Sequence, residues 1–440
     1  MTEAVAALQA LVRIPTVSYA DPERLDVAAF DAFVAELERR FPLLHQHLGL
    51  TRVGSHGLLF HWRGRAADRP VVLMAHLDVV PVVEDAPWQH PPFSADLVDG
   101  AIWGRGTLDD KGCLVGICAA VEGLLADDVT PAQDVWLSFG CDEEVSGHAA
   151  PEAVAELEQR GVRPWFVLDE GGAVAHQAFP GVGVPVAVIG VTEKGTTSLR
   201  LSVDGRGGHA STPARHGPTA RLSRAILRLD RSPFPASTPA PTLELMRRLA
   251  PHAPAALAPL MGRADRLQRL LTRALIAAGP EAAAMTRTTA AVTTLSGSPA
   301  HNVIASNATA GVNVRVMVGD TVDGVVAHVR KAIRDSQVRV EVIEAGEPSP
   351  VSPYDGDEAF ALLESTVGEL FPDVVVSPYV MMAATDSRFF TRICDRVYRF
   401  APFRMSKAQR ESIHSYDEHI GVDDFLAGIR WYRRLIEGIS

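Results

Sequence analysis

A histidine and an aspartate stand together at the end of a strongly apolar stretch. Val71–Leu77 is apolar apart from His76, and Asp78 follows directly. Such a run predicts a strand buried on both faces of a sheet. Ligands of open α/β sheets bind beyond the carboxyl ends of the strands, and at strand spacing His76 and Asp78 project to the same side there. The pair suits a metal-bound imidazole oriented by a carboxylate, and it equally suits a buried histidine satisfied by its neighbour.

Acidic residues also follow the strands predicted at 134–140 and 164–168 and the loop after Trp103. They are Asp142, Glu143, Glu144, Asp169, Glu170, Asp109 and Asp110. One acidic doublet is more typical of a solvated turn or a helix N-cap, but several at one sheet edge repel one another unless cations compensate. Together with a histidine they indicate a divalent metal site. Of two adjacent glutamates, one can ligate a metal while the other takes a proton from water.

Strands and helices alternate along most of the 440 residues. This order predicts an α/β fold with a mostly parallel sheet and helices on both faces. Between residues 192 and 346 the order changes to β-α-β-β-α-β, which predicts an inserted ferredoxin-like domain. We therefore expect a larger domain of residues 1–191 and 347–440, and a helical insertion at about 233–287 within the smaller one. The Pro- and Gly-rich segment Trp88–Gly106 is predicted to be a long loop.

Composition excludes several classes of partner. The net charge of −11 argues against nucleic acid as a partner. No apolar run of roughly 18 residues predicts a membrane span, and the N-terminus lacks the pattern of a secretory signal. The four cysteines form no C-x-x-C pair, which favours free thiols in a reducing compartment. We expect a cytoplasmic protein.

Taken in order, these motifs resemble the M20 family of co-catalytic zinc metallopeptidases. The matching segments are His76-Leu77-Asp78, Gly104–Gly112, Asp142-Glu143-Glu144 and Leu168–Gly171. The family includes glutamate carboxypeptidase, aminoacylase, dipeptidases and succinyl-diaminopimelate desuccinylase. The segment Trp88–Phe93 is most similar to the branch of Gly-X carboxypeptidases and N-acyl-amino-acid hydrolases. The resemblance covers nearly the whole chain and implies a catalytic domain with an inserted lid or dimerisation domain.

The resemblance also assigns roles to individual residues. It implies one zinc on His76 and Glu170, a second on Glu144 and His414, and Asp109 bridging both. Asp78 would orient His76, Glu143 would be the general base, and the peptide bond from Asp109 to Asp110 would be cis. Two alternatives stay open, because a shift of one residue would replace Glu170 with Asp169, and His419 lies near His414.

The inserted domain carries three further residues that resemble functional ones. Gly207–Ser211 resembles the segment of the family's lid histidine, so His209 would stabilise the oxyanion, across the subunit interface in dimeric members. By itself, a histidine in a Gly-rich turn is more often a surface residue. Asn302 and Arg315 resemble lid residues that hold the substrate's free carboxylate, although a strand arginine is nearly as typical of an inter-strand ion pair. Ala384 stands where the family usually has glycine in a loop near the last ligand.

The leading hypothesis is hydrolysis of an amide bond next to a free carboxylate, in a small peptide or an N-acyl amino acid. Water activated by two Zn²⁺ ions would lose its proton to Glu143, which would pass it to the leaving amine. Mn²⁺ or Co²⁺ could replace zinc at a carboxylate-rich site. An aminopeptidase and a non-catalytic binding homologue are the alternatives. A homodimer through the lid domain is possible, and the substrate's side chain and acyl group are not specified by the sequence.

Overall fold

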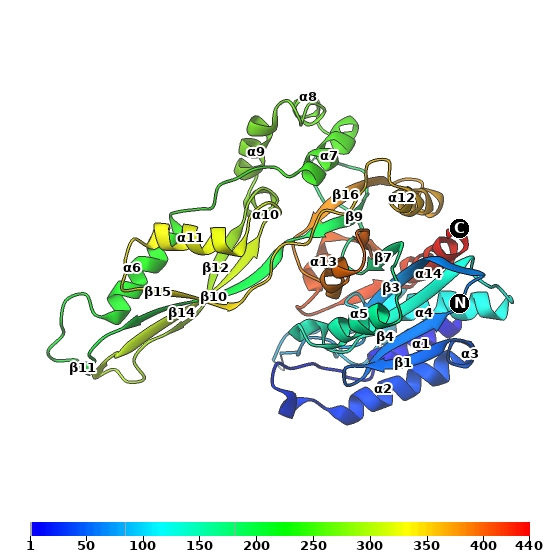
Figure 1. The fold of residues 1–440 in the computed structure, drawn as a ribbon, viewed down its shortest axis with the longest axis horizontal. Coiled ribbons are helices and arrows are strands. Elements are labelled where there is room, and N and C mark those ends of the chain that lie inside the picture. Colours follow the sequence, from blue (N-terminus) through cyan, green and yellow to red (C-terminus); the bar gives the residue numbers. More distant parts are fainter. Residues whose placement is uncertain (1, 84, 180) are drawn as a thin grey trace.

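The chain builds two large, separate β-sheets, shown in Figure 1. The computed structural model describes residues 2–83, 85–179 and 181–440. The larger sheet has ten strands, which are β1 (Gly49–Val53), β2 (Gly57–Trp62), β3 (Ala66–His76), β6 (Gln133–Gly140), β7 (Phe166–Asp169), β8 (Val174–Ala175), β9 (Val186–Glu193), β16 (Val375–Met381), β17 (Val397–Arg399) and β18 (Arg404–Met405). Their order is β1-β2-β6-β3-β7-β17-β9-β8-β18, with β16 paired to β9.

The centre of the larger sheet is parallel. Strand β3 runs parallel to β6 and β7, and β17 runs parallel to β7. The hairpin β1–β2 joins β6 in antiparallel orientation at one edge. Residues 70–76 of β3 are all buried, as a strand covered on both faces requires. The predicted α/β fold class with a mostly parallel sheet is confirmed.

Alternate side chains of β3 enter two different cores, because successive residues of a strand face opposite sides. Leu73 and Ala75 pack with the helices of one face, whereas Val72 and Met74 pack with those of the other. The first layer contains α1 (Thr2–Val12), α2 (Val27–Arg40), α3 (Pro42–His47), α4 (Lys111–Ala126), α12 (Glu358–Leu370) and α14 (Val422–Gly438). The second contains α5 (Ala149–Gln159) and the 3₁₀ helix η4 (Asp386–Arg392). No helix among the described residues is both long and apolar enough to cross a membrane.

The smaller sheet has the ferredoxin-like arrangement. Its elements in chain order are β10 (Gly195–Asp204), α6 (Pro218–Asp230), β12 (Thr289–Ser296), β14 (Asn307–Val316), α11 (Val322–Ile333) and β15 (Arg339–Glu344). The strands lie in the order β12-β14-β10-β15 and pair antiparallel. Every second residue of β14 is buried, and these residues pack with α6 and α11. The other face of the sheet carries no helix in Figure 1.

The Pro- and Ala-rich stretch predicted to be helical forms four short helices. They are α7 (Ala240–Leu249), α8 (Ala258–Met261), α9 (Gln268–Ala277) and α10 (Pro280–Ala284). In sequence this stretch interrupts the ferredoxin-like unit, but in space α7 packs against β16 of the larger sheet. Leu245 and Leu249 are fully buried there in a cluster that includes Val186 of β9.

The segment predicted to be one long loop contains a hairpin. Strands β4 (Asp96–Val98) and β5 (Ala101–Trp103) pair antiparallel, and β5 also pairs with β19 (His419–Gly421). The Pro- and Gly-rich composition predicted a loop, and the second partner of β5, strand β19, lies more than 300 residues later in the chain, beyond the reach of local sequence patterns. The small three-stranded sheet thus brings the segment before Asp109 next to the C-terminal segment that follows His414.

Leu73→Ala should destabilise the protein by about 2–5 kcal/mol, because the side chain is fully buried at the centre of β3 and its removal leaves a cavity. Urea unfolding followed by circular dichroism measures the change. Val83→Ala is the control, since Val83 is 71% exposed and its truncation should stay within about 0.5 kcal/mol. Equal midpoints for the two variants would contradict this account of the core.

Candidate metal centre

Three neighbouring strands of the larger sheet end at one edge, and the predicted ligands follow them. His76 is the last residue of β3, Glu144 lies in the 3₁₀ helix η2 (Glu143–Val145) after β6, and Glu170 comes directly after β7. Asp109 lies in the turn before α4, and His414 follows α13 (Lys407–Ser412). The order β6-β3-β7 explains the first three, because parallel neighbours present their carboxyl ends together.

The first group of possible ligands consists of His76, Asp109 and Glu170. His76 Nε2 lies 3.0 Å from Asp109 Oδ1 and 3.7 Å from Glu170 Oε1. One donor atom from each residue lies within 4.8 Å of the others. Two carboxylates and an imidazole at this spacing can hold a divalent cation.

The second group consists of Asp109, Glu144 and His414. His414 Nε2 lies 2.8 Å from Asp109 Oδ2 and 3.0 Å from Glu144 Oε2. Asp109 therefore belongs to both groups and turns one carboxylate oxygen toward each histidine. This is the arrangement of a bridging carboxylate between two metals.

The charges of the site fit a pair of divalent cations. Burial, followed by the negative charge of Asp109, raises the pKa of Glu170 well above its usual value. Burial likewise raises the pKa of Glu144, although its contact with His414 opposes the shift. Hydrogen bonds to Asp109 and Glu144 raise the pKa of His414 to about 10, so this imidazole holds a proton where a cation could bind. Bound cations would replace that proton and offset the repulsion between the buried carboxylates.

Asp78 is buried next to His76, and its carboxylate also contacts the segment that carries Glu143 and Glu144. His76 Nδ1 lies 3.0 Å from the main-chain oxygen of Asp78 and 3.4 Å from its carboxylate, so the carbonyl is the nearer partner. The Asp78 carboxylate accepts hydrogen bonds from Ser18 Oγ at 2.7 Å and from the backbone N–H groups of Glu143 and Glu144, both at 3.2 Å. Asp78 thus also fixes the start of η2.

Glu143 lies beside the two groups and belongs to neither. Burial raises the pKa of its carboxyl well above the usual value, and the charge of Asp386 adds to the shift while His76 opposes it. A carboxylate with a raised pKa that is not committed to a metal can accept and return a proton.

The structure separates the two alternative ligands from the metal groups. Asp169 accepts the N–H of Glu170 at 2.9 Å and that of Ser387 at 2.8 Å, so its carboxylate anchors backbone. His419 stacks on Trp103 with ring centroids 4.1 Å apart. Neither belongs to either group, whereas Glu170 and His414 do.

The backbone next to Asp109 matches the implied geometry. The peptide bond between Asp109 and Asp110 is cis. Asp110 is buried and accepts the N–H of His76 at 3.3 Å, which ties the turn to the end of β3.

Sequence reasoning missed a buried ion pair beside the site. Arg399 Nε lies 3.1 Å from Glu193 Oε2, and the same oxygen accepts the N–H of Thr385 at 3.1 Å. The pair therefore holds the loop that begins at Ala384. Glu193 is the last residue of the apolar strand β9, so a search for acidic residues at strand ends could have found it. Its partner Arg399 lies 206 residues later, and no local pattern indicates that pairing.

The three predicted lid residues do not converge on the metal groups within one chain. His209 lies in β11 (Gly208–His209), which pairs with β13 (Val303–Ile304), and the backbone of Asn302 accepts the N–H of Ala210 at 3.0 Å. Figure 1 shows β11 at the far end of the smaller sheet, away from β3 and β7. The reason is the length of β10, which carries the chain outward from the larger sheet before β11 forms.

Arg315 lies at the opposite end of the smaller sheet. It faces Thr196 across the β10–β14 pair and donates to Thr196 Oγ1 at 2.8 Å, so its partner is a hydroxyl and not the carboxylate of an ion pair. Thr196 lies eight positions from Asp204, which is at the other end of β10. At about 3.3 Å per residue this places Arg315 roughly 26 Å from that end of the strand. His209 and Arg315 of one chain thus cannot hold the same small substrate.

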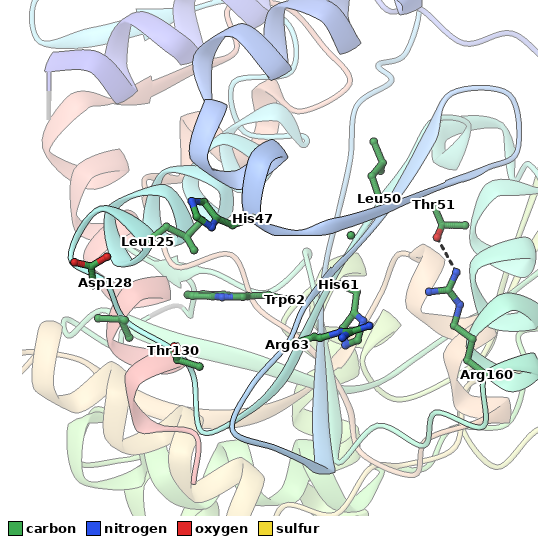
Figure 2. Close-up of a pocket in the computed structure, with 12 residues that line it drawn as sticks. His47, Leu50, Thr51, His61, Trp62, Arg63, Leu125, Asp128, Thr130 and Arg160 are labelled. Carbon is green, nitrogen blue, oxygen red and sulfur yellow. Dashed lines mark hydrogen bonds between the residues drawn. The ribbon is translucent and has the colours of Figure 1, made fainter.

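A polar hollow of about 710 Å³ lies elsewhere, against the β1–β2 hairpin (Figure 2). Its lining includes His47, His61, Arg63 and Arg160, and Arg160 bonds Thr51 at its edge. None of the predicted site residues lines it. The candidate metal centre therefore rests on its ligand geometry and not on this hollow.

Comparison with known proteins gives a consistent result. A model of peptidase family M20/M25/M40 matches residues 72–438. The N-fatty-acyl-amino acid synthase/hydrolase PM20D1 of Xenopus tropicalis is 34% identical over 441 residues, which cover 98% of this chain and 85% of the relative. The probable carboxypeptidase S-like 2 of Dictyostelium discoideum is 33% identical over 433 residues, covering 96% of this chain and 82% of the relative.

Solved structures share the fold. The M20 family metallo-carboxypeptidase Sso-CP2 from Sulfolobus solfataricus superposes with a TM-score of 0.72 at 17% identity, covering 99% of both chains. Human carnosine dipeptidase 1 gives a TM-score of 0.68 at 17% identity, covering 100% of this chain and 96% of the other.

We predict that the folded protein binds two zinc ions per chain and that the His414→Ala variant binds one, because the second group of possible ligands loses its only imidazole. His419→Ala is the matched control and should keep both, since its ring stacks on Trp103. Metal analysis of the purified, folded variants measures the difference. Loss of zinc from the His419 variant instead would show that the C-terminal ligand was misassigned.

Proposed function

Since the chain belongs to peptidase family M20/M25/M40, we propose that it hydrolyses an amide bond next to a free carboxylate in a small peptide or an N-acyl amino acid. One observation carries this proposal, namely that two groups of ligands share Asp109 while Glu143 lies beside them uncommitted. The relatives support the substrate class, because their names describe carboxypeptidases and enzymes of N-fatty-acyl amino acids. A peptide with a free C-terminus and an N-acyl amino acid both carry a carboxylate next to the amide bond that would be hydrolysed.

The residues that would hold the metals are His76, Glu170 and Asp109 at one position, and Glu144, His414 and the same Asp109 at the other. Two divalent cations would supply Lewis acidity that polarises a carbonyl and lowers the pKa of water. Zinc suits this mixture of imidazole and carboxylate ligands, and Mn²⁺ or Co²⁺ could substitute.

Glu143 would move the proton. Its carboxylate takes a proton from the water that attacks the amide carbonyl and delivers it to the nitrogen of the leaving amine. Both transfers need a carboxyl group whose pKa lies above that of an exposed glutamate, and the burial of Glu143 provides this. Asp78 supports the role by holding the backbone of Glu143 and Glu144.

The substrate's carboxylate and oxyanion would be bound by residues of the smaller sheet. A guanidinium can pair with a carboxylate through two hydrogen bonds, and Arg315 keeps part of its donor set free of the contact with Thr196. His209 and Asn302 would come from a second copy of the chain, because β11 lies far from the metal groups of its own chain. This arrangement requires the predicted homodimer. The cytoplasmic location also stays a prediction.

Glu143→Gln should keep both metals and lower kcat by about 10²–10⁴-fold, because the amide cannot accept the proton. The control is Glu156→Gln, the same chemical change on α5 at a half-buried residue that pairs with Arg160 and belongs to neither group of possible ligands, and it should leave kcat unchanged. Hydrolysis of an acyl-amino-acid and dipeptide panel, together with metal analysis, measures both. Near-normal kcat in Glu143→Gln would exclude this residue as the base. Well under one metal per chain with no hydrolysis by the wild type would favour a non-catalytic binding protein.

Arg315→Met should raise KM for a free N-acyl amino acid by about 10–100-fold, the effect of losing a charge-assisted pair. The same variant should not change the slower turnover of the amide-capped analogue, which lacks the carboxylate. If the wild type prefers a capped substrate with a free amine, the aminopeptidase alternative gains and the carboxylate proposal fails.

A further inference from the structure

Glu418 is a fully buried carboxylate whose partners surround the bridging aspartate. Its Oε1 accepts the backbone N–H of Leu108 at 2.8 Å and that of Asp109 at 3.2 Å, and both of its oxygens lie 3.1 Å from the N–H of Gly106. Glu418 belongs to neither group of possible ligands. Its carboxylate therefore fixes the backbone of the turn that carries Asp109.

Arg105 joins this carboxylate to the segment of the last ligand. Its Nη1 donates to Glu418 Oε2 at 2.6 Å, and its Nη2 donates to the main-chain oxygen of Ser415 at 2.5 Å. Ser415 is the residue directly after His414. The buried ion pair of Arg105 and Glu418 thus contacts the backbone at Asp109 and the backbone directly after His414, the two members of the second group that lie in loops.

The turn between Arg105 and Asp109 can adopt this shape only with glycine at position 106. Gly106 has φ of +87°, and a Cβ there would lie 2.8 Å from Val79 Cγ1. With this left-handed conformation, the N–H groups of Gly106, Leu108 and Asp109 point toward one carboxylate, while that of Thr107 donates to the carbonyl of Gly104. A concave row of backbone donors of this kind needs an anion, and Glu418 supplies it.

We propose that Glu418, paired with Arg105, is a positioning residue that sets Asp109 and His414 at the separation needed to hold the second metal. The inference rests on the proposed function only in taking Asp109 and His414 as ligands. A buried carboxylate that loses its charge leaves the guanidinium and the backbone donors without a full complement of acceptors. The ligand loops would then be free to move relative to one another.

Titration of the metal-free protein with Co²⁺ tests this without reference to activity. Glu418→Gln should weaken the second Co²⁺ by about 10–100-fold, the usual effect of losing a partner behind a ligand, and should change the visible absorption of that ion. Asp357→Asn is the matched control. The Asp357 side chain is 6% exposed, and its carboxylate likewise accepts two backbone N–H groups and a hydrogen bond from Arg396 at 2.7 Å, but it caps α12. That variant should lose stability while keeping both Co²⁺ affinities and the spectrum.

Arg105→Lys provides a second variant that keeps the buried charge paired. A single ammonium cannot reproduce the two diverging N–H bonds to Glu418 and Ser415, so the second Co²⁺ should again weaken while the first stays within about twofold. Unchanged affinity for both ions in the folded variants, or an equal loss in the Asp357 variant, would overturn the proposal. If wild-type protein binds two ions but hydrolyses no substrate, the proposed function fails while the Co²⁺ result still decides the role of Glu418.

Discussion

Negative charge buried at one edge of the larger sheet is the constraint on which the rest of the structure depends. Asp109, Glu143, Glu144 and Glu170 lie together there, and burial acts to raise the pKa of each of these carboxyl groups. Two histidines lower the pKa of Asp109 and make it the most acidic group of the cluster. Carboxylates are not gathered in a protein interior without compensating positive charge. Among the described salt bridges, no lysine or arginine contacts these four carboxylates. Cations bound by the two groups of possible ligands would supply the missing positive charge.

Acidic residues that do not belong to the metal groups hold the ones that do. Asp78 accepts the N–H groups of Glu143 and Glu144, Asp169 accepts that of Glu170, and Glu418 accepts that of Asp109. Each is buried and lies within a few residues, or one strand, of a ligand. Backbone N–H groups are fixed in direction, so a carboxylate that collects them fixes the ligand's main chain. The site is therefore built from two layers of carboxylates, and only the inner layer supplies the possible metal ligands.

The two sheets divide the proposed chemistry between them. The larger sheet carries the two groups of possible ligands and the proposed base Glu143, whereas the residues expected to contact the substrate lie on the smaller one. Its length places β11 and Arg315 at opposite ends, so one chain cannot bring His209 and Arg315 to one substrate. The helices α7–α10 belong to the same insertion in sequence, yet α7 packs on β16 and anchors that connection to the larger sheet.

The sequence by itself indicated most elements of the larger sheet, and its resemblance to a known family nominated the candidate ligands. Apolar runs ending in His76, Glu144 and Glu170 specify buried strands with polar ends, and parallel pairing brings such ends together. Only the tertiary structure places Glu170 and His414 within the two groups of possible ligands and Asp169 and His419 outside them, because convergence in space is set by the fold and not by residue type. It also revealed the hydrogen bonds that Glu418 and Arg105 make. Their contacts join residues 313 positions apart, and no local pattern of the sequence records a pairing at that distance.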